Sequence, residues 1–434
     1  MKKYQPTIGI EIHVELGTLS KMFCGCPAEH FRTVPNTLTC PVCLGLPGAL
    51  PVPNEKAIQD TIKIGLALHC KVSAKSKFDR KQYFYPDLPK GYQITQYDEP
   101  LCTNGHLFTS QGKVRITRVH LEEDTGKLLH KKVNGKDVTL VDFNRSGVPL
   151  VEIVTEPDIH SAAQAKEFAQ KLRHIIRYLE VSDCGMEKGS MRLEVNVSWG
   201  LGLGYKVEVK NLNSFRFVKR AIDYELKRQK KLLESGKTPK QETRGWDDRE
   251  NRTKPQRYKE TSADYRYFPE PDIPPLTFSK RYISGIKKTL PELPDSVAQR
   301  LEKTFKLRLQ YAKVLSAEKA TAEFAEQALK IAIKDKVKVR DVASLIINRK
   351  VNITKTTPAK LVESVKRKKG SRVRNSKTVE PWVDQAISQL PKAAQDYRKG
   401  KKAAIEALIG KVMQLSKGQA DPTLTKKLLQ EKLK

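Results

Sequence analysis

The sequence predicts an α+β protein in which a sheet-rich region is followed by an all-helical region. Up to about residue 290, several segments place apolar residues at every second position, which is typical of strands with one buried face. This pattern favours a mostly antiparallel sheet. After Leu290 the strand patterns nearly vanish, and amphipathic segments rich in Ala, Lys, Glu and Leu follow.

The elements of the sheet-rich region can be assigned in chain order. Residues 161–180 and 214–236 have helical spacing, and Ser161 and Ser214 are predicted N-caps, because a serine oxygen can accept a hydrogen bond from the first turn. The alternating, strand-like segments are residues 8–16, 114–122, 138–144, 150–156, 191–199 and 205–212.

These changes in pattern divide the chain into three predicted domains. We expect a sheet-rich domain over 1–292, a helical domain over 293–378 and a helical tail domain over 379–434. The proline-dense segment 268–278 is expected to be an edge or a linker. The stretch Val365–Lys377, whose charges are all basic, is expected to be a hinge between the two helical parts.

The composition indicates a polyanionic partner. Lysine and arginine number 81 against 49 acids, for a formal charge of +32, and basic side chains gain affinity for phosphates by releasing counterions. Nucleic acid is favoured over an anionic membrane surface, because the basic clusters lack interleaved large aromatic residues. General lysine enrichment for solubility is the alternative.

No membrane partner is expected. No run approaches eighteen apolar residues, and the N-terminal MKKYQPTIGI lacks both an apolar signal core and a transit-peptide pattern. We therefore expect a cytoplasmic protein.

The first predicted strand, residues 8–16, has an unusual polar side. Its apolar residues alternate with Glu11, His13 and Glu15, so two acids and an imidazole share one face. Period two alone leaves open whether this face lies in water or lines a site that handles cations.

Further acids occur in strand-like segments. An acid within an apolar strand is costly to bury unless a metal or a base neutralises it, and oxygen-rich sites prefer Mg²⁺ or Mn²⁺, often with nucleotide phosphates. Several unrelated solvated rows are the alternative. The sequence has no P-loop and no Rossmann fingerprint, so any ATP site is of another type. The acids are Glu122, Glu123, Asp124, Glu152, Glu194 and Glu208.

Four cysteines have the spacing of a metal site. Cys24 and Cys26 form C-x-C, Cys40 and Cys43 form C-x-x-C, and thirteen residues separate the pairs. Two close thiolate pairs suit tetrahedral Zn²⁺ in a structural role, since no coordination position would stay open. Unligated thiols are the alternative.

Two loops dense in basic and aromatic residues are further candidates for functional sites. Loops of this composition are often functional, and their basic side chains could contact phosphates. The basic residues are Arg80, Lys81, Lys90 and Arg266, and the aromatic residues are Tyr83, Tyr85 and Tyr267.

Several long segments carry a resemblance to a known family. IEIHVEL, KFDRKQYFYPDLPKGYQITQYDEPL, HLEEDTGK, GVPLVEIVTEPD, VKNLNSFRFVKRAIDYE and DYRYFPEPDIPPL occur in the order and spacing of the GatB family. This family comprises the B subunits of aspartyl/glutamyl-tRNA amidotransferases. The match is dense over residues 4–295 and resumes in the tail, where DYRKGKKAAIEALIGKVMQLSKGQADPTLTKKLLQEKL resembles the family's tRNA-binding tail domain.

The resemblance implies a function and partners. The chain would be one member of a heterotrimer with an amidase A subunit, which releases ammonia from glutamine, and a small C subunit. It would use ATP to phosphorylate the side-chain carboxylate of Glu or Asp misacylated onto tRNA(Gln) or tRNA(Asn), and ammonia would displace the phosphate. The implied fold is an antiparallel cradle related to glutamine synthetase.

The resemblance also implies site residues. Glu11, His13, Glu123 and Glu152 would be catalytic and would hold Mg²⁺. The ATP-binding group would comprise Arg80, Lys90, Glu122, Glu194 and Glu208; at the position of Glu194 the family commonly has Asp. The zinc ligands would be Cys24, Cys26, Cys40 and Cys43, although only part of the family has these cysteines.

One departure and one alternative accompany this interpretation. The segment between about 345 and 380 is shorter and more basic than the family's usual helical domain. The alternative function is a non-enzymatic, zinc-stabilised RNA-binding protein, which would gain little from keeping acids near phosphates.

Overall fold

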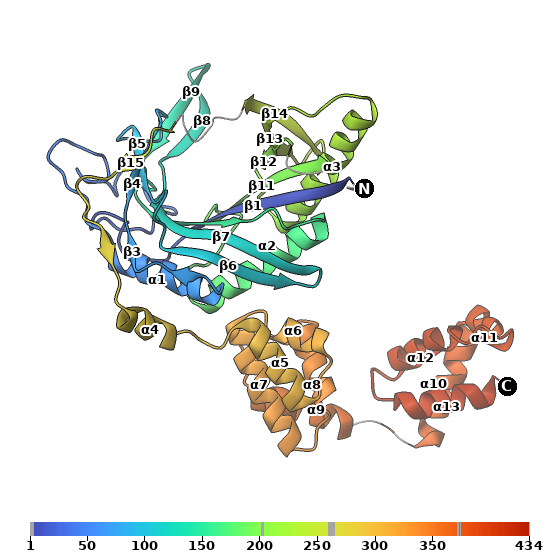
Figure 1. Ribbon diagram of the computed structural model, residues 1–434. Coiled ribbons are helices and arrows are strands. Elements are labelled where there is room, and N and C mark those ends of the chain that lie inside the picture. Colours follow the sequence, from blue (N-terminus) through green and yellow to red (C-terminus); the bar gives the residue numbers. More distant parts are fainter. Residues whose placement is uncertain (1–3, 201–203, 259–264, 371–372, 374, 434) are drawn as a thin grey trace. The chain divides into compact units, whose positions relative to one another are not determined.

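The computed structural model describes residues 4–200, 204–258, 265–370, 373 and 375–433. The chain divides into two compact units, Met1–Ser296 and Val297–Lys434. The predicted α+β class is confirmed, since a large sheet fills the first unit and helices make up the second (Figure 1). The boundaries of the three predicted domains stay predictions.

A nine-stranded sheet forms the frame of the first unit within its described residues. All neighbouring strands are antiparallel except β12 and β13, which are parallel. In spatial order the strands are β14 (Arg252–Tyr258), β13 (Glu242–Asp247), β12 (Val207–Lys210), β11 (Met191–Gly200), β1 (Gln5–Glu15), β10 (Pro149–Thr155), β7 (Gly112–Glu123), β6 (Cys102–Thr109) and β2 (Lys71–Val72).

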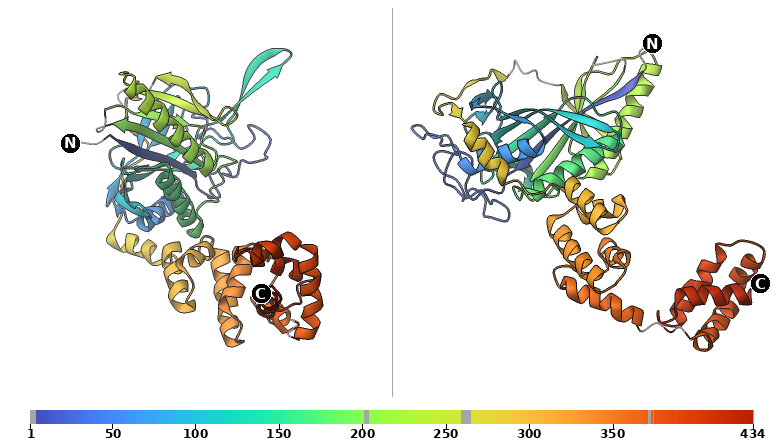
Figure 2. Two further views of the ribbon diagram at one scale, coloured as in Figure 1. Left: turned by 90° about the vertical axis from the view of Figure 1, so that its right-hand side faces the viewer. Right: turned by 60° about the horizontal axis from the view of Figure 1, so that its bottom comes forward.

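Helices cover one face of this sheet, as the blue helix α1 and the green helices α2 and α3 show in Figures 1 and 2. The helices are α1 (Glu55–Ala67), α2 (Ala162–Tyr178) and α3 (Phe215–Glu234). Ser161 and Ser214 cap α2 and α3 as predicted, each accepting a hydrogen bond from a backbone N–H of the first turn. Gly236 follows α3 at φ +76°, in the left-handed region that glycine adopts without strain.

The alternation of β1 creates the two faces of the sheet. Ile8, Ile10, Ile12 and Val14 are buried in the core beneath α2 and α3, where apolar surface leaves water. The residues between them therefore lie on the opposite face, where none of the described helices of the unit packs.

Short elements surround this frame. They are β3 (Lys75–Ser76) with β16 (Leu276–Thr277), β4 (Asp79–Gln82) with β5 (Tyr92–Thr95) and β15 (Phe268–Pro269), the hairpin β8 (Lys127–Val133) and β9 (Lys136–Asp142), and helix α4 (Lys280–Lys288). The proline-dense segment thus contributes two edge strands, where the missing N–H of proline is tolerated.

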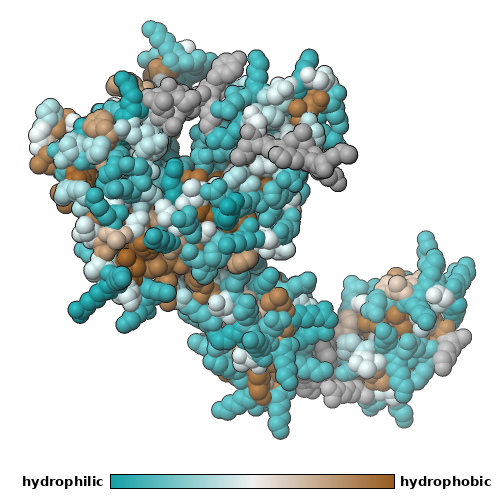
Figure 3. Space-filling model, in the orientation of Figure 1, coloured by the Kyte–Doolittle hydropathy of each residue, from teal (hydrophilic) through white to brown (hydrophobic). Residues whose placement is uncertain are grey.

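The described residues of the second unit form helices joined by loops, with one isolated β-bridge between Val373 and Ala420. Hydrophilic side chains cover most of the face of this unit that Figure 3 shows. The last four helices enclose an apolar core of their own. The helices are α5 (Pro294–Phe305), α6 (Leu309–Leu315), α7 (Lys319–Lys334), α8 (Val339–Ile347), α9 (Pro358–Gly370), α10 (Ser376–Gln389), α11 (Pro391–Arg398), α12 (Ala404–Leu415) and α13 (Pro422–Lys432). Among the helices described, none is both long and apolar enough to cross a bilayer.

Candidate active site and metal centres

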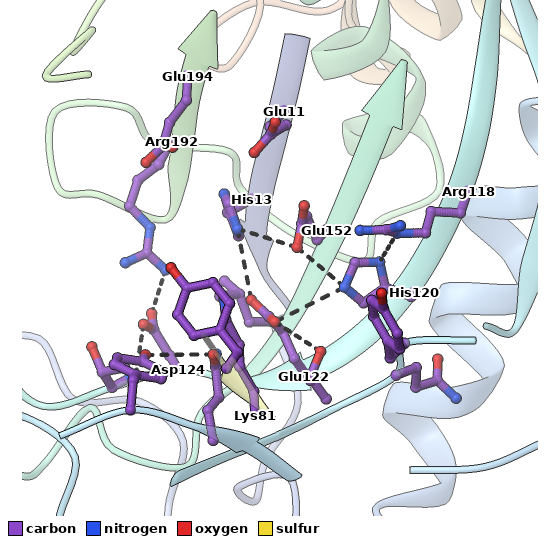
Figure 4. A pocket seen from close by; sticks show the side chains of 18 of the residues that line it. Glu11, His13, Lys81, Arg118, His120, Glu122, Asp124, Glu152, Arg192 and Glu194 are labelled. Carbon is purple, nitrogen blue, oxygen red and sulfur yellow. Dashed lines mark hydrogen bonds and ion pairs between the residues drawn. The ribbon is translucent and has the colours of Figure 1, made fainter. Parts of the chain in front are cut away.

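A cavity of about 580 Å³ lies on the face of the sheet that the helices leave open (Figure 4). Strands β1, β7, β10, β11 and β12 supply its wall, and the segments around β4, β5 and Tyr265–Tyr267 supply its rim. The ionisable lining residues other than tyrosine are Glu11, His13, Lys81, Arg118, His120, Glu122, Asp124, Glu152, Arg192, Glu194, Lys206, Glu208 and Lys210.

Strand register brings one cluster together from three strands. His13 of β1 lies opposite Glu152 of β10, and Glu122 of β7 lies opposite Leu150 of β10. The Nε2 atom of His13 is 3.6 Å from Oε2 of Glu152 and 3.7 Å from Oε1 of Glu122. One ligand atom from each of the three residues lies within 4.8 Å of the others, a spacing that could hold a metal ion.

A second cluster lies beside the first. Glu11 of β1 is opposite Glu194 of β11, and one ligand atom each from Glu11, Glu194 and Glu208 also fall within 4.8 Å. Each carboxylate already has a protein partner. Asn196 donates to Glu11 at 2.8 Å, Lys210 to Glu194 at 3.0 Å and Thr243 to Glu208 at 2.7 Å.

The electrostatics of the first cluster favour a cation. Burial opposes protonation of His13, but the hydrogen bond to Glu152 and the negative charges of Glu152, Glu122 and Glu194 outweigh it and raise the pKa of His13 to about 9. The cluster therefore binds a proton near neutral pH, where an isolated imidazole would release it. A divalent cation would neutralise the same negative charges.

The four predicted zinc ligands also come together. Ligand atoms of Cys24, Cys26, Cys40 and Cys43 lie within 4.8 Å of one another, so the group could hold a metal ion. The backbone N–H of Cys40 donates to Sγ of Cys43 at 3.1 Å. This contact forms the tight turn expected of the C-x-x-C pair.

A buried lysine accompanies the cysteines. The side chain of Lys21 is fully buried, and its Nζ lies 3.7 Å from Sγ of Cys43 and donates to the Leu38 carbonyl at 2.7 Å. A hydrogen bond from Cys24, and in smaller part the charge of Lys21, lower the pKa of Cys43 to about 4. A thiolate is the form that binds a metal. Sequence reasoning missed Lys21, since nothing in its neighbourhood marks a buried lysine.

Comparisons with known proteins decide the family. Residues 6–284 match the GatB/GatE catalytic domain, and residues 284–433 match the GatB domain. The chain belongs to the GatB family. The B subunit of the aspartyl/glutamyl-tRNA(Asn/Gln) amidotransferase of Thermotoga maritima is 45% identical over 478 residues, which cover 99% of each chain.

Other GatB relatives carry the same name. The protein of Caldanaerobacter subterraneus subsp. tengcongensis is 43% identical over 476 residues and 99% of each chain, and that of Thermodesulfovibrio yellowstonii is 42% identical over 481 residues and the whole of each chain. Because these alignments are longer than the 434 residues of this chain, the relatives contain segments that it lacks.

The cavity collects six of the residues that the GatB resemblance implied. They are Glu11, His13, Glu122, Glu152, Glu194 and Glu208. Their common position follows from the period of two, which turns all of them toward the helix-free face. Their roles in binding or catalysis stay predictions.

Three other implied residues do not line this GatB cavity. Glu123 follows Leu121 in the alternation of β7, so its side chain leaves the strand on the other side and pairs with Lys90 at 2.6 Å. Arg80 forms a bidentate ion pair with Glu270, in which Nε and Nη2 donate to the two carboxylate oxygens at 2.7 and 2.8 Å. The geometry places Glu122, and not Glu123, beside His13.

Several lining residues were missed or left unassigned. Arg118 and His120 share the parity of Glu122 on β7, so the same alternation could have indicated them. Arg192 pairs with Asp124 at 2.6 Å across the cavity, although the two residues are far apart in the sequence. No local sequence pattern predicts such a contact.

Proposed function

We propose that this chain is the amidotransferase component that activates the side-chain carboxylate of Glu or Asp carried by tRNA(Gln) or tRNA(Asn). The observation that carries the proposal is the open cavity whose wall joins His13, Glu122 and Glu152, in a chain that matches GatB proteins along its whole length. An activating component needs a site that gathers several negative groups, and this cavity presents the side chains for that task.

The first cluster fits a divalent cation such as Mg²⁺. Carboxylate oxygens, of which the cluster offers two groups, are preferred ligands of Mg²⁺ and Mn²⁺. We assign His13, Glu122 and Glu152 as the residues that would hold it, with Glu11, Glu194 and Glu208 as a second candidate set. When bound, the cation would neutralise repulsion between ATP phosphates and the substrate carboxylate.

Basic residues of the lining would complete charge balance. Lys81, Arg118 and Arg192 reach the cavity from β4, β7 and β11, which places cationic groups on several of its sides (Figure 4). Guanidinium and ammonium groups bind phosphate oxygens through charge-assisted hydrogen bonds. They would orient ATP for in-line attack.

The proposed reaction has two steps, phosphorylation of the carboxylate and displacement of the phosphate by ammonia. A carboxylate oxygen of the substrate attacks the γ-phosphorus of ATP, the bond from that phosphorus to the bridging oxygen breaks, and ADP leaves. Ammonia then attacks the acyl carbon, the bond from carbon to the phosphate oxygen breaks, and the proton lost by nitrogen leaves with the phosphate. The products are the amide, ADP and phosphate.

Zn²⁺ is proposed for the four cysteines, in a structural role. Four thiolates fill a tetrahedral shell and leave no position for a substrate. The adjacent Lys21 supports this assignment, because a Zn²⁺ ion with four thiolates carries net negative charge.

The chain would act as one subunit of a larger complex that binds tRNA. The amidase A subunit and the small C subunit would complete the enzyme, the basic helical unit would contact tRNA, and translation would place the complex in the cytoplasm. A carboxylate-lined antiparallel sheet also supports the predicted relation to glutamine synthetase.

Reconstitution tests this function against the RNA-binding alternative. The chain is purified with its A and C partners, and amidated tRNA is measured from Glu-tRNA(Gln) and Asp-tRNA(Asn) with ATP, Mg²⁺ and glutamine. E152Q should lose the product but keep tRNA binding, whereas D137N, in the exposed β8–β9 hairpin, should retain both. Unchanged amidation by E152Q, or tRNA binding without any amidation by the unsubstituted complex, would contradict the proposal.

A further inference from the structure

A second histidine, His120, contacts the first cluster without belonging to it. It lies on β7 opposite Glu152, and only 2% of its surface is exposed. Its Nε2 is 3.1 Å from Oε2 of Glu152 and 3.9 Å from Oε2 of Glu122. His120 thus touches the two carboxylates that His13 approaches from β1 (Figure 4).

A neighbouring arginine determines which nitrogen of His120 carries the proton. Nε of Arg118 donates to Nδ1 of His120 at 3.3 Å. A guanidinium can only donate, so Nδ1 must be the acceptor and the ring proton must stand on Nε2. That N–H points to Oε2 of Glu152.

This direction separates the two histidines. A protonated Nε2 has no lone pair for a cation, so His120 cannot bind a metal through the atom that faces the cluster. It can hold the Glu152 carboxylate in one orientation, as hydrogen-bond partners behind metal ligands commonly do. The side chain of His13, by contrast, is 20% exposed toward the cavity.

We propose that His120 is a positioning residue that, oriented by Arg118, holds Glu152 for a divalent cation at the cluster of His13, Glu122 and Glu152. The inference rests on the proposed function only in requiring that this cluster bind a cation. The chain Arg118–His120–Glu152 lies along two adjacent strands, so the rigid sheet keeps its three members in register.

Two substitutions separate positioning from mere packing. In H120Q the side-chain amide can place an N–H where Nε2 stands, whereas in H120N the shorter amide reaches only the position of Nδ1. The matched control is H106N, which changes a histidine of the neighbouring strand β6 that lies outside the cavity. Binding of Mn²⁺ to the full chain is measured by the electron paramagnetic resonance signal of free Mn²⁺.

We expect H120N to bind Mn²⁺ about 10- to 100-fold more weakly than the unsubstituted chain, the usual effect of removing a partner behind a metal ligand. H120Q and H106N should bind with nearly unchanged affinity. Unchanged binding by H120N, or equal loss in H120Q, would overturn the inference. If H120N does not fold, H120Q decides alone: nearly unchanged Mn²⁺ affinity supports the inference, and an affinity weaker by about tenfold or more overturns it. Failure of the unsubstituted chain to bind Mn²⁺ would instead overturn the metal site on which the proposed function depends, and the inference with it.

Discussion

The ion pair between Arg80 and Glu270 should stabilise the first unit. The side chain of Glu270 is fully buried, and Nε and Nη2 of Arg80 donate to its two oxygens at 2.7 and 2.8 Å. The pair fastens β15 to β4, whose register places Phe268 opposite Arg80. The guanidinium also lies 4.3 Å from the centre of the Tyr92 ring.

R80M removes the cation and leaves the Glu270 carboxylate buried without it. Breaking a buried pair in this way costs about 3–5 kcal/mol. With a urea dependence of about 3 kcal/mol per molar for a unit of this size, the unfolding midpoint should fall by about 1–1.7 M. In a W382F background, Trp199 and Trp246 report the unfolding of the first unit by fluorescence.

The control is R115M, which breaks an ion pair of the same geometry on the surface. Arg115 donates to both oxygens of Asp158 at 2.7 Å, but its side chain is 60% exposed. Exposed pairs contribute little, so the midpoint should hardly move. If R80M keeps the midpoint of the unsubstituted chain while its affinity for ATP falls, Arg80 is a phosphate contact and the reasoning is refuted.

Three further results are expected. E122Q should weaken Mn²⁺ binding while E123Q leaves it unchanged, as measured by titration; the reverse order would place the cluster on the other side of β7. Mn²⁺ affinity should rise about tenfold from pH 7 to 8 and level off above pH 9, because His13, with its pKa raised to about 9, must lose its proton before it can bind a cation. H13A should flatten this dependence. K21M should release Zn²⁺ to a chelator faster than the unsubstituted chain, because the charge beside Cys43 is lost; an equal rate would remove Lys21 from the metal site.

Much of the site follows from a period of two. Glu11 and His13 alternate with buried isoleucines, so their common face could be predicted from the sequence. The same rule sends Glu122 and Glu123 to opposite sides of β7, so only one of them can share a face of this strand with His120. Family resemblance selected both acids, whereas the geometry of the strand allows only one at this cavity.

Contacts between distant segments could not be predicted in this way. The basic, aromatic loop around Arg80 predicts a phosphate contact, but no local pattern predicts its ion pair with Glu270, which lies 190 residues further along the chain. Nothing in the sequence around Lys21 predicts that its side chain is buried. Its burial is explained only by its contact with Cys43, which the fold creates.

The sequence by itself determined the α+β class, the family, the cysteine cluster and the polar face of the first strand, because these depend on local periodicity, spacing and long motifs. The tertiary structure decided which acids meet and which bases pair away from the cavity. The physical reason is strand register: the order β11–β1–β10–β7 sets side by side residues that the chain keeps far apart, and only that order makes His13, Glu122 and Glu152 one site.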